Sequence, residues 1–369
     1  MLPYGRGSDW GFTPHITPPP PRYNCDVMKK VRWGVLGVAN IAVKRVIPSM
    51  QAGECSEIVG IASRDRARAL AAARDLGIPK AYGSYEEMLA DPEIDAIYNP
   101  LPNHLHLPWS TRAAEAGKHV LCEKPIGLNL REALALMAVR DRTGVKIGEG
   151  FMVQNHPQWL RIVELVRAGR IGQLRSAVGT FSYFKLEAGN IRNIREYGGG
   201  ALFDIGCYAI KTSRMVFGEE PVSVSAAITR DPQFGGIDML TSAILEYPSG
   251  HCVFTCSTQI MHQQSMRFFG STGRIEAEIP FNATPGGTSR VRIDDGRDLN
   301  GGGLVTEELP PCDQYTIQGD LFSRAIRQGG EVPVPLEDAV RTMAVIDAVF
   351  LSAETGRKQC PADVLRAAG

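Results

Sequence analysis

The sequence predicts an α/β protein in two parts, a doubly wound parallel sheet of the Rossmann type followed by an α+β domain with a large, mostly antiparallel open sheet. In the first half, apolar strands alternate with helices, which favours right-handed crossovers and a parallel sheet. In the second half, strands follow one another, and Pro248-Ser249-Gly250 marks a hairpin turn. A length of 369 residues suits two domains. We expect an arm at 1–28 and domains at 29–150 and 151–369.

Composition and charge argue against several classes of partner. Lys plus Arg and Asp plus Glu each number 40, so the net charge is zero and neither a nucleic acid nor an anionic membrane is indicated. No segment approaches the roughly 20 apolar residues of a membrane-spanning helix. The 8 cysteines are scattered without the spacing of a zinc site. We therefore expect a cytoplasmic protein with reduced cysteines, no metal site and a small neutral ligand.

Residues 1–28 are a different kind of sequence, with Pro14 and the run Pro18 to Pro21. A proline run favours polyproline II and forms no packed core. Two interpretations stay open. One is a disordered leader, including a true start at Met28, and the other is an arm that packs across a binding site or a neighbouring subunit.

The first strand, 31–37, ends in a pattern typical of nucleotide binding. The residues from Gly37 to Ala42 read G-x-A-x-x-A, where the dinucleotide fingerprint reads G-x-G-x-x-G/A. The middle glycine normally lets the backbone approach a pyrophosphate, and a small shift would accommodate the methyl group of Ala39. Because strands and helices alternate after this turn, we expect it to bind NAD(P). The residues that would contact the cofactor here are Gly37, Ala39, Asn40 and Ile41.

The second strand, 57–62, ends where such folds choose between NAD and NADP. An acid there binds the ribose hydroxyl of NAD, whereas a base accommodates the phosphate of NADP. Ser63 and Arg64 offer a hydroxyl and a guanidinium to a phosphate, so the sequence favours NADP. Asp65 keeps NAD open, and a simpler role for Ser63 or Asp65 is to cap the helix at 65–76.

The loop after the strand at 94–98 carries prolines and histidines on the side where open sheets bind ligands. We expect Pro102, Asn103 and His106 to face the cofactor. A plain helix-entry loop is an equally good interpretation. His104 and His106 have the spacing of metal ligands, but the sequence suggests no third ligand nearby.

Pro125 ends the strand at 118–122, because proline lacks the N–H that continues a ladder and biases the residue before it away from helix. Glu123 and Lys124 then stand at the carboxyl tip of a parallel strand and point toward a ligand. The alternative is a solvated charge pair that closes the strand.

A glycine-rich turn, Gly198 to Gly200, opens a helix that carries Asp204 and Tyr208. Glycines permit close approach of the backbone to a ligand, and residues four apart share one helix face. The alternatives are that Tyr208 packs in the core and that Asp204 only favours the helix dipole.

Together these pieces resemble the glucose-fructose oxidoreductase / inositol dehydrogenase / MocA family from about residue 31 to about residue 350. The resemblance rests on L-P-N-x-x-H ending at His106, A-G-K-H-V-L-C-E-K-P ending at Pro125, H-P-Q starting at His156, and G-G-G-x-L-x-D-x-G-x-Y ending at Tyr208. Most distant members carry histidine at the last position. With tyrosine at this position, the chain resembles the branch of the family that contains aldose and xylose dehydrogenases and dimeric dihydrodiol dehydrogenase. The chain departs from the family pattern at Ala39 and at Gln154, where arginine is common.

The resemblance implies that Lys124 is the catalytic lysine, that Tyr208 is the general acid/base and that Asp204 binds a substrate hydroxyl. It also implies cofactor contacts for Glu123 and Lys124. Oxidising an alcohol by hydride transfer requires a group that takes the hydroxyl proton, and a nearby ammonium would favour the phenolate of Tyr208. We add His156 and Arg192 to the substrate pocket, although a solvated loop charge explains Arg192 as well.

We therefore expect an NADP-dependent oxidoreductase that acts on the anomeric CH–OH of a cyclic aldose such as glucose or xylose, or in the reverse carbonyl reduction. The alternatives are a tightly NADP-bound aldose-aldose oxidoreductase, a dicarbonyl-sugar reductase and a trans-dihydrodiol dehydrogenase. A non-catalytic nucleotide-binding regulatory protein is an alternative of another class, because a fold does not fix a function.

The second half carries alternating strands near 222–229, 240–247, 251–259, 266–269 and 274–279, with amphipathic helices at 317–327 and 336–355. An antiparallel sheet with helices on one face leaves its other face free. We expect that face to join subunits into a homodimer or homotetramer.

Overall fold

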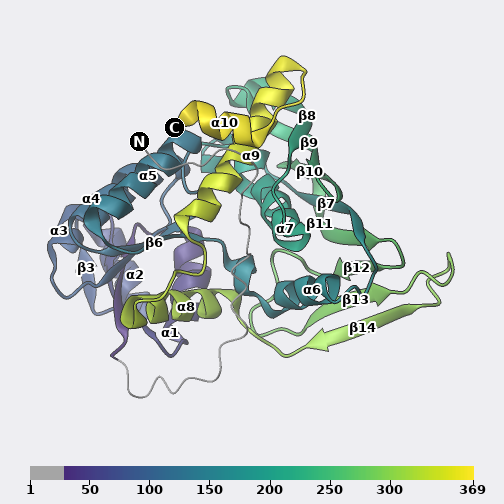
Figure 1. The fold of residues 1–369 in the computed structure, drawn as a ribbon. Helices are drawn as coiled ribbons and strands as arrows, with labels where there is room; N and C mark the ends of the chain where they lie inside the picture. Colours follow the sequence, from purple (N-terminus) through teal and green to yellow (C-terminus); the bar gives the residue numbers. More distant parts are fainter. Residues whose placement is uncertain (1–28) are drawn as a thin grey trace.

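The first half of the chain forms a six-stranded parallel sheet in the order β3-β2-β1-β4-β5-β6 (Figure 1). The computed structural model describes residues 29–369, and the predictions for 1–28 lie outside the described residues. The predicted alternation of strands and helices is confirmed. The strands are β1 (Val31–Leu36), β2 (Ser56–Ala62), β3 (Lys80–Tyr82), β4 (Ala96–Asn99), β5 (His119–Glu123) and β6 (Ile147–Gly150). The helices are α1 (Ile47–Gln51), α2 (Arg66–Leu76), α3 (Tyr85–Ala90), α4 (His106–Glu115) and α5 (Leu130–Thr143).

The strand order reverses at β1, because β2 pairs with one side of this strand and β4 with the other. Open parallel sheets bind ligands at such a switch point, beyond the carboxyl ends of the strands. Gly37 lies there with φ of 79°, a conformation that favours glycine. A Cβ at Gly37 would also lie 3.0 Å from Leu101 Cδ2. The first glycine of the fingerprint is therefore required by the backbone.

The second sheet has eight strands in the order β14-β13-β12-β11-β7-β10-β9-β8. Its pairs are antiparallel except β7 with β10, which run parallel. The predicted fold class, with a mostly antiparallel second sheet, is confirmed. The strands are β7 (Leu174–Phe184), β8 (Ser223–Asp231), β9 (Ile237–Tyr247), β10 (Gly250–Ser257), β11 (Gln259–Gly270), β12 (Arg274–Ala277), β13 (Ser289–Asp294) and β14 (Leu304–Leu309).

Three of these strands, β7, β13 and β14, were not predicted. β14 is mostly exposed and lacks apolar alternation. Its carboxylates accept hydrogen bonds from arginines outside the strand: Arg161 donates to Glu307, and Arg290 donates to Glu308. β7 lies in the middle of the sheet between β10 and β11. The position of β7 depends on partner residues that are 75 to 96 residues away in the chain. A local sequence pattern does not show such pairing.

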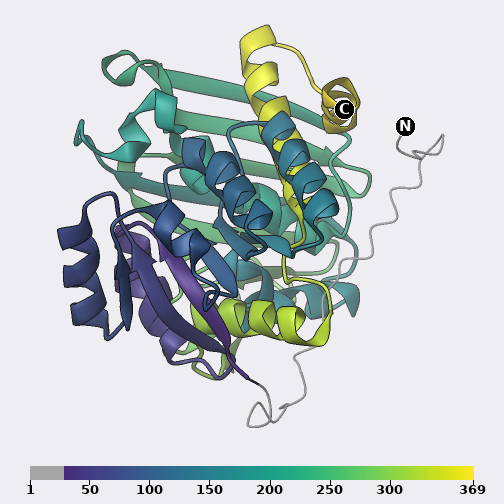
Figure 2. The same ribbon diagram turned by 90° about the vertical axis from the view of Figure 1, so that its left-hand side faces the viewer.

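Helices α6 (Pro157–Arg167), α7 (Cys207–Phe217) and α9 (Leu336–Thr355) cover the face of the large sheet that looks toward the parallel sheet (Figures 1 and 2). The last helix is α10 (Pro361–Ala368). Helix α8 (Gln314–Gln328) returns to the parallel sheet. There Trp33 Nε1 donates to Ser323 Oγ at 3.0 Å, and the Trp33 ring meets Phe322 edge-on. The two sheets are therefore joined through their helices, with the site between them.

Asp347 on α9 offers a test of stability against pH. Its Oδ2 accepts the N–H of Leu130, the first residue of α5, at 3.0 Å, and burial raises the pKa of its carboxyl to about 6. The folded protein therefore keeps this proton to a higher pH than the unfolded chain does. The stability that the neutral carboxyl contributes is complete below the unfolded pKa of 3.8 and is lost as pH rises toward 6.

We expect Asp347→Asn, which keeps an acceptor oxygen for Leu130, to raise the free energy of unfolding by about 2 kcal/mol at pH 8 and by much less at pH 4. Urea unfolding at both pH values measures this. Asp75→Asn, at an exposed carboxylate of α2, is the control. An equal change at both pH values would contradict the assignment.

Candidate active site

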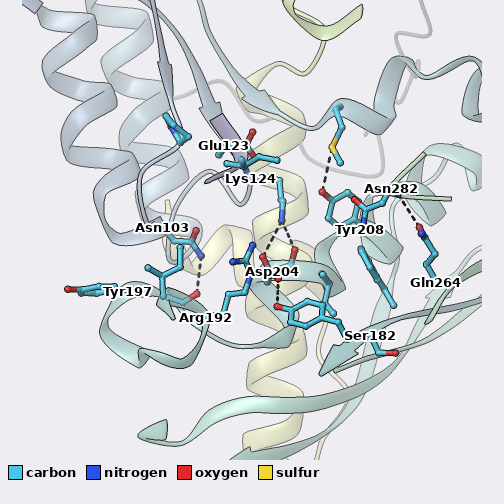
Figure 3. Close-up of a pocket in the computed structure, with 18 of the residues that line it drawn as sticks. Asn103, Glu123, Lys124, Ser182, Arg192, Tyr197, Asp204, Tyr208, Gln264 and Asn282 are labelled. Atoms are coloured by element: carbon cyan, nitrogen blue, oxygen red, sulfur yellow. Dashed lines mark hydrogen bonds and ion pairs between the residues drawn. The ribbon is translucent and has the colours of Figure 1, made fainter. Parts of the chain in front are cut away.

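A cavity of about 630 Å³ lies beyond the carboxyl ends of β4 and β5, and the large sheet forms its far wall (Figure 3). Polar side chains reach it from the loop after β4, the end of β5, strands β7 and β11, the loop at 191–198 and the helical segments that carry Asp204 and Tyr208. The parallel sheet supplies the side next to the nucleotide-binding turn, where Ile41 lines the cavity. The cavity therefore joins the predicted cofactor side to the second half of the chain.

Lys124 follows the last residue of β5, as the position of Pro125 predicts. Its ammonium lies in the cavity and donates to the backbone oxygen of Asp204 at 2.5 Å. It also lies 3.7 Å from Asp204 Oδ1, with only 12% of its side chain exposed. The alternative of a solvated charge pair is therefore wrong for Lys124, because the lysine reaches across the cavity to Asp204, just before α7 (Cys207–Phe217), rather than into solvent.

Asp204 is the centre of the polar cluster. Arg192 Nε donates to its Oδ2 at 2.8 Å, and the hydroxyl of Tyr183 donates to the same oxygen at 2.5 Å. Burial by itself raises the pKa of this carboxyl, but Arg192, Lys124 and the hydrogen bonds from Arg192 and Tyr183 outweigh burial and hold the pKa well below its usual range. Asp204 is therefore a carboxylate at neutral pH, with acceptor capacity left for a ligand hydroxyl.

Tyr208 lies one turn further along, after the π-helical segment Leu202–Gly206. Its hydroxyl lies 3.5 Å from Met152 Sδ, and the ammonium of Lys124 lies 4.9 Å from the ring centroid, over the ring face. Burial raises the pKa of the phenol well above its usual value, and nearby Tyr315 adds to this. The sequence analysis expected the ammonium of Lys124 to favour the phenolate and so to lower this pKa. Lys124 stands over the ring rather than at the hydroxyl, so in this structure Tyr208 is a neutral donor.

The residues after β2 are the ones on which the predicted choice between NAD and NADP depends. The carboxylate of Asp65 accepts the N–H groups of Ala67 and Arg68 and so caps α2. Ser63 is buried, and its Oγ accepts the N–H of Asp65 at 3.2 Å. Arg64 is exposed. The carboxylate of Asp65 is thus engaged in a helix cap, and the guanidinium beside it lies at the surface.

The comparisons with known proteins agree with this geometry. The model of an oxidoreductase family with a NAD-binding Rossmann fold (GFO/IDH/MocA) matches residues 31–151, and the model of the GFO/IDH/MocA C-terminal domain matches residues 159–276. An uncharacterized oxidoreductase of Rhizobium meliloti is 48% identical over 330 residues, which are 89% of this chain and 98% of that protein. The chain belongs to the GFO/IDH/MocA oxidoreductase family.

Two further proteins that are similar to this chain have named activities. The D-xylose 1-dehydrogenase (NADP(+)) 2 of Haloferax volcanii is 42% identical over 328 residues, which are 88% of this chain and 98% of that protein. The crystal structure of an aldose-aldose oxidoreductase from Caulobacter crescentus in complex with glycerol matches with a TM-score of 0.83 and 27% identity, over 90% of this chain and all of that chain. This protein is thus an oxidoreductase with an NAD(P)-binding Rossmann domain.

The two predicted histidines of this GFO/IDH/MocA chain serve the scaffold. His106 borders the cavity, but its ring nitrogens lie 2.7 Å from the carbonyl oxygens of Pro125 and Leu101. Burial lowers the pKa of its imidazole to about 4, although the two carbonyls favour the cation. His106 therefore ties the lysine loop to the loop after β4. In that loop Pro102 precedes the short helix Asn103–Leu105.

His156 is not brought to the cavity. Its Nδ1 accepts the N–H of Gln158 at the start of α6, and its Nε2 lies 3.4 Å from Cys312 Sγ. Substrate contact through His156 was expected from its position in a motif. Its local role as a helix cap places the ring in the interior instead, with 1% of the residue exposed.

Sequence reasoning missed the residues that the large sheet contributes. Tyr183 on β7 binds Asp204, and Gln264 on β11 lies on the far wall, where its Oε1 accepts the N–H groups of Phe281 and Asn282 at 3.0 Å each (Figure 3). The signal for Tyr183 was the alternation of Val178 to Phe184, which reads as a strand with an aromatic face. For Gln264 we see no such signal.

No helix among residues 29–369 has both the length and the apolar character that crossing a membrane requires.

Proposed function

We propose that this protein is an NADP-dependent oxidoreductase that oxidises the anomeric hydroxyl of a cyclic aldose or catalyses the reverse carbonyl reduction. The observation that carries the proposal is the convergence of a phenol, an ammonium and a carboxylate, Tyr208, Lys124 and Asp204, on one cavity beside the nucleotide-binding turn. The dehydrogenase of Haloferax volcanii, whose name gives D-xylose and NADP(+), supports the choice of substrate and cofactor.

Gly37, Ala39, Asn40 and Ile41 would hold the cofactor at the switch point, with Ser63 and Arg64 at its phosphate and Glu123 and Lys124 at its reactive end. Pro102 and Asn103 would bound it from the loop after β4, where Asn103 Nδ2 donates to Gly198 O at 2.9 Å. Bound NADP supplies the acceptor for a hydride, or NADPH its donor.

The protein's own groups move the proton and orient the sugar. During reduction the phenol of Tyr208 can give its proton to the carbonyl oxygen and become a phenolate. In oxidation the phenolate form takes the hydroxyl proton of the sugar and returns to the phenol. The ammonium of Lys124 can donate to the reacting oxygen and stabilise negative charge on it. Asp204, fixed by Arg192 and Tyr183, can accept a neighbouring sugar hydroxyl.

The proposal is tested by mixing the purified protein with NADP and an aldose panel led by xylose and glucose, and measuring NADPH per chain. Many equivalents support a dehydrogenase. A burst of about one equivalent, reoxidised by a second sugar, indicates an aldose-aldose oxidoreductase instead. Turnover only with dicarbonyl sugars or trans-dihydrodiols would show that the substrate is one of these compounds and not an aldose. Binding of NADP without any turnover favours a regulatory protein.

Arg64→Ala tests the choice of cofactor. Because a hydrogen bond to a charged group contributes about 1.5–3 kcal/mol, we expect the KM for NADP to rise roughly 10- to 100-fold while the KM for NAD changes little. Initial rates with each cofactor measure this. Arg74→Ala, at an exposed arginine in the last turn of α2, is the control. A parallel loss with both cofactors would show that Arg64 does not read the phosphate.

We also propose that the free face of the large sheet joins subunits. Val178, Val253 and Ile244 lie side by side on neighbouring strands of that face and are 40–42% exposed. No helix in the described part of the chain covers this face (Figure 1).

We expect Val253→Asp to convert an oligomer into monomers in sedimentation velocity. Assembly would bury the new carboxylate of every subunit in the interface, which costs free energy. Leu70→Asp, at an exposed apolar residue of α2, should leave the oligomer intact. Unchanged sedimentation of Val253→Asp would place the interface elsewhere.

A further inference from the structure

Glu149 is a buried carboxylate next to the loop that carries Lys124. It lies on β6, opposite Cys122 of β5 in the sheet register, and is 2% exposed. Its Oε1 accepts the N–H of Ile126 at 3.0 Å. Ile126 stands two residues after Lys124, so this hydrogen bond holds the chain directly behind the lysine.

The same carboxylate faces the helix that carries Tyr208. Lys211 and Arg214, three and six residues after Tyr208 on α7, are the buried cations that act on Glu149, while Glu123 on β5 repels it. Lys211 is ion-paired with Asp338 on α9, which also accepts from Arg214. The ammonium of Lys211 lies 5.7 Å from the ring centroid of Phe151, and that ring contacts the ring of Tyr208 at 5.0 Å. Buried charge thus connects β6, α7 and α9 behind the cavity.

Keeping this carboxylate is costly. Burial raises the pKa of Glu149 despite the nearby cations, and Oε2 has no hydrogen-bond partner among residues 29–369. A buried polar atom left without a partner costs free energy. An apolar side chain would fill the space behind β5 at lower cost, but it would leave the N–H of Ile126 without an acceptor.

We propose that Glu149 is a positioning residue that fixes the Lys124 loop against the helix carrying Tyr208, so that the ammonium and the phenol meet the same reacting oxygen. The inference rests on the proposed function for its catalytic part. It acts through the backbone of Ile126, because Glu149 does not line the cavity.

Three variants test the role. Glu149→Leu removes the acceptor, and Glu149→Gln keeps an acceptor oxygen for Ile126. Asp347→Leu is the matched control, because Asp347 also accepts one backbone N–H, from Leu130, but lies on α9 and has no contact with the Lys124 loop among the hydrogen bonds of the described residues. We expect Glu149→Leu to lower kcat about 100-fold with the KM for sugar within about 3-fold, as for a misplaced catalytic group. Glu149→Gln should restore kcat to within about 5-fold, and Asp347→Leu should lower Tm but not kcat.

A second readout does not need turnover. In protein labelled with ¹⁵N-isoleucine, the amide of Ile126 should exchange with solvent at least about 10-fold faster in Glu149→Leu than in the wild type. It should be unchanged in Glu149→Gln and Asp347→Leu. If the wild type oxidises no sugar while the exchange rates follow this order, the proposed function fails and the anchoring of the loop stands.

Two results would overturn the inference. One is an unchanged Ile126 exchange rate in Glu149→Leu. The other is a loss of kcat in Glu149→Leu no larger than that in Asp347→Leu at the same loss of Tm, since Glu149 would then matter only for stability.

Discussion

Replacing Tyr208 by phenylalanine is expected to lower kcat for sugar oxidation about 10³-fold, with the KM for NADP unchanged. The phenol of Tyr208 keeps its proton at neutral pH and can pass it to the reacting oxygen, whereas Asp204 is held as a carboxylate. General acid/base groups typically contribute about 10² to 10⁴ in rate. Steady-state rates in both directions, with NADP and with NADPH, measure the loss.

Tyr247→Phe is the matched control for this prediction. Tyr247 is a buried tyrosine on β9. Its hydroxyl is hydrogen-bonded to Ser213 Oγ at 2.8 Å, and Ser213 lies on α7 five residues after Tyr208. Its loss should cost stability without changing kcat. Full turnover by Tyr208→Phe would remove Tyr208 from the chemistry and leave proton transfer to another group.

Replacing Lys124 by methionine has the second large expected effect. The side chain of Lys124 is 12% exposed. The partners of its ammonium are the backbone oxygen and the carboxylate of Asp204. Donors aimed at a developing negative charge in such a site contribute about 10² to 10³ in kcat. We therefore expect kcat to fall by about 10³-fold. Part of the loss should appear in the KM for the sugar, because Asp204 loses a neighbouring cation.

Lys118→Met controls for loss of a buried lysine beside the same strand. Lys118 Nζ donates to the carbonyl oxygens of Asp91 and Ile94 at 2.8 Å each, and Lys118 does not line the cavity. This variant should be less stable but retain kcat. If Lys124→Met lost no more activity than Lys118→Met, the ammonium would have a structural role only.

The sequence alone determined the parts of the site that local chemistry enforces. Gly37 ends β1 at a positive φ, and Pro125 stops β5 so that Lys124 stands at its tip. Asp204 and Tyr208 follow a glycine turn at a spacing that brings both to one cavity. Each of these features depends on a few neighbouring residues, which is why their pattern predicts them.

Only the tertiary structure decided the electrostatics and the far wall. Tyr183 reaches Asp204 from a strand whose partner residues lie 75 to 96 residues further along the chain. His156 was expected in the cavity but caps α6. Lys124 lies over the ring of Tyr208, so burial sets the direction of the phenol's pKa. Burial and the distance between segments far apart in sequence arise only when the two sheets pack, and no local pattern encodes them.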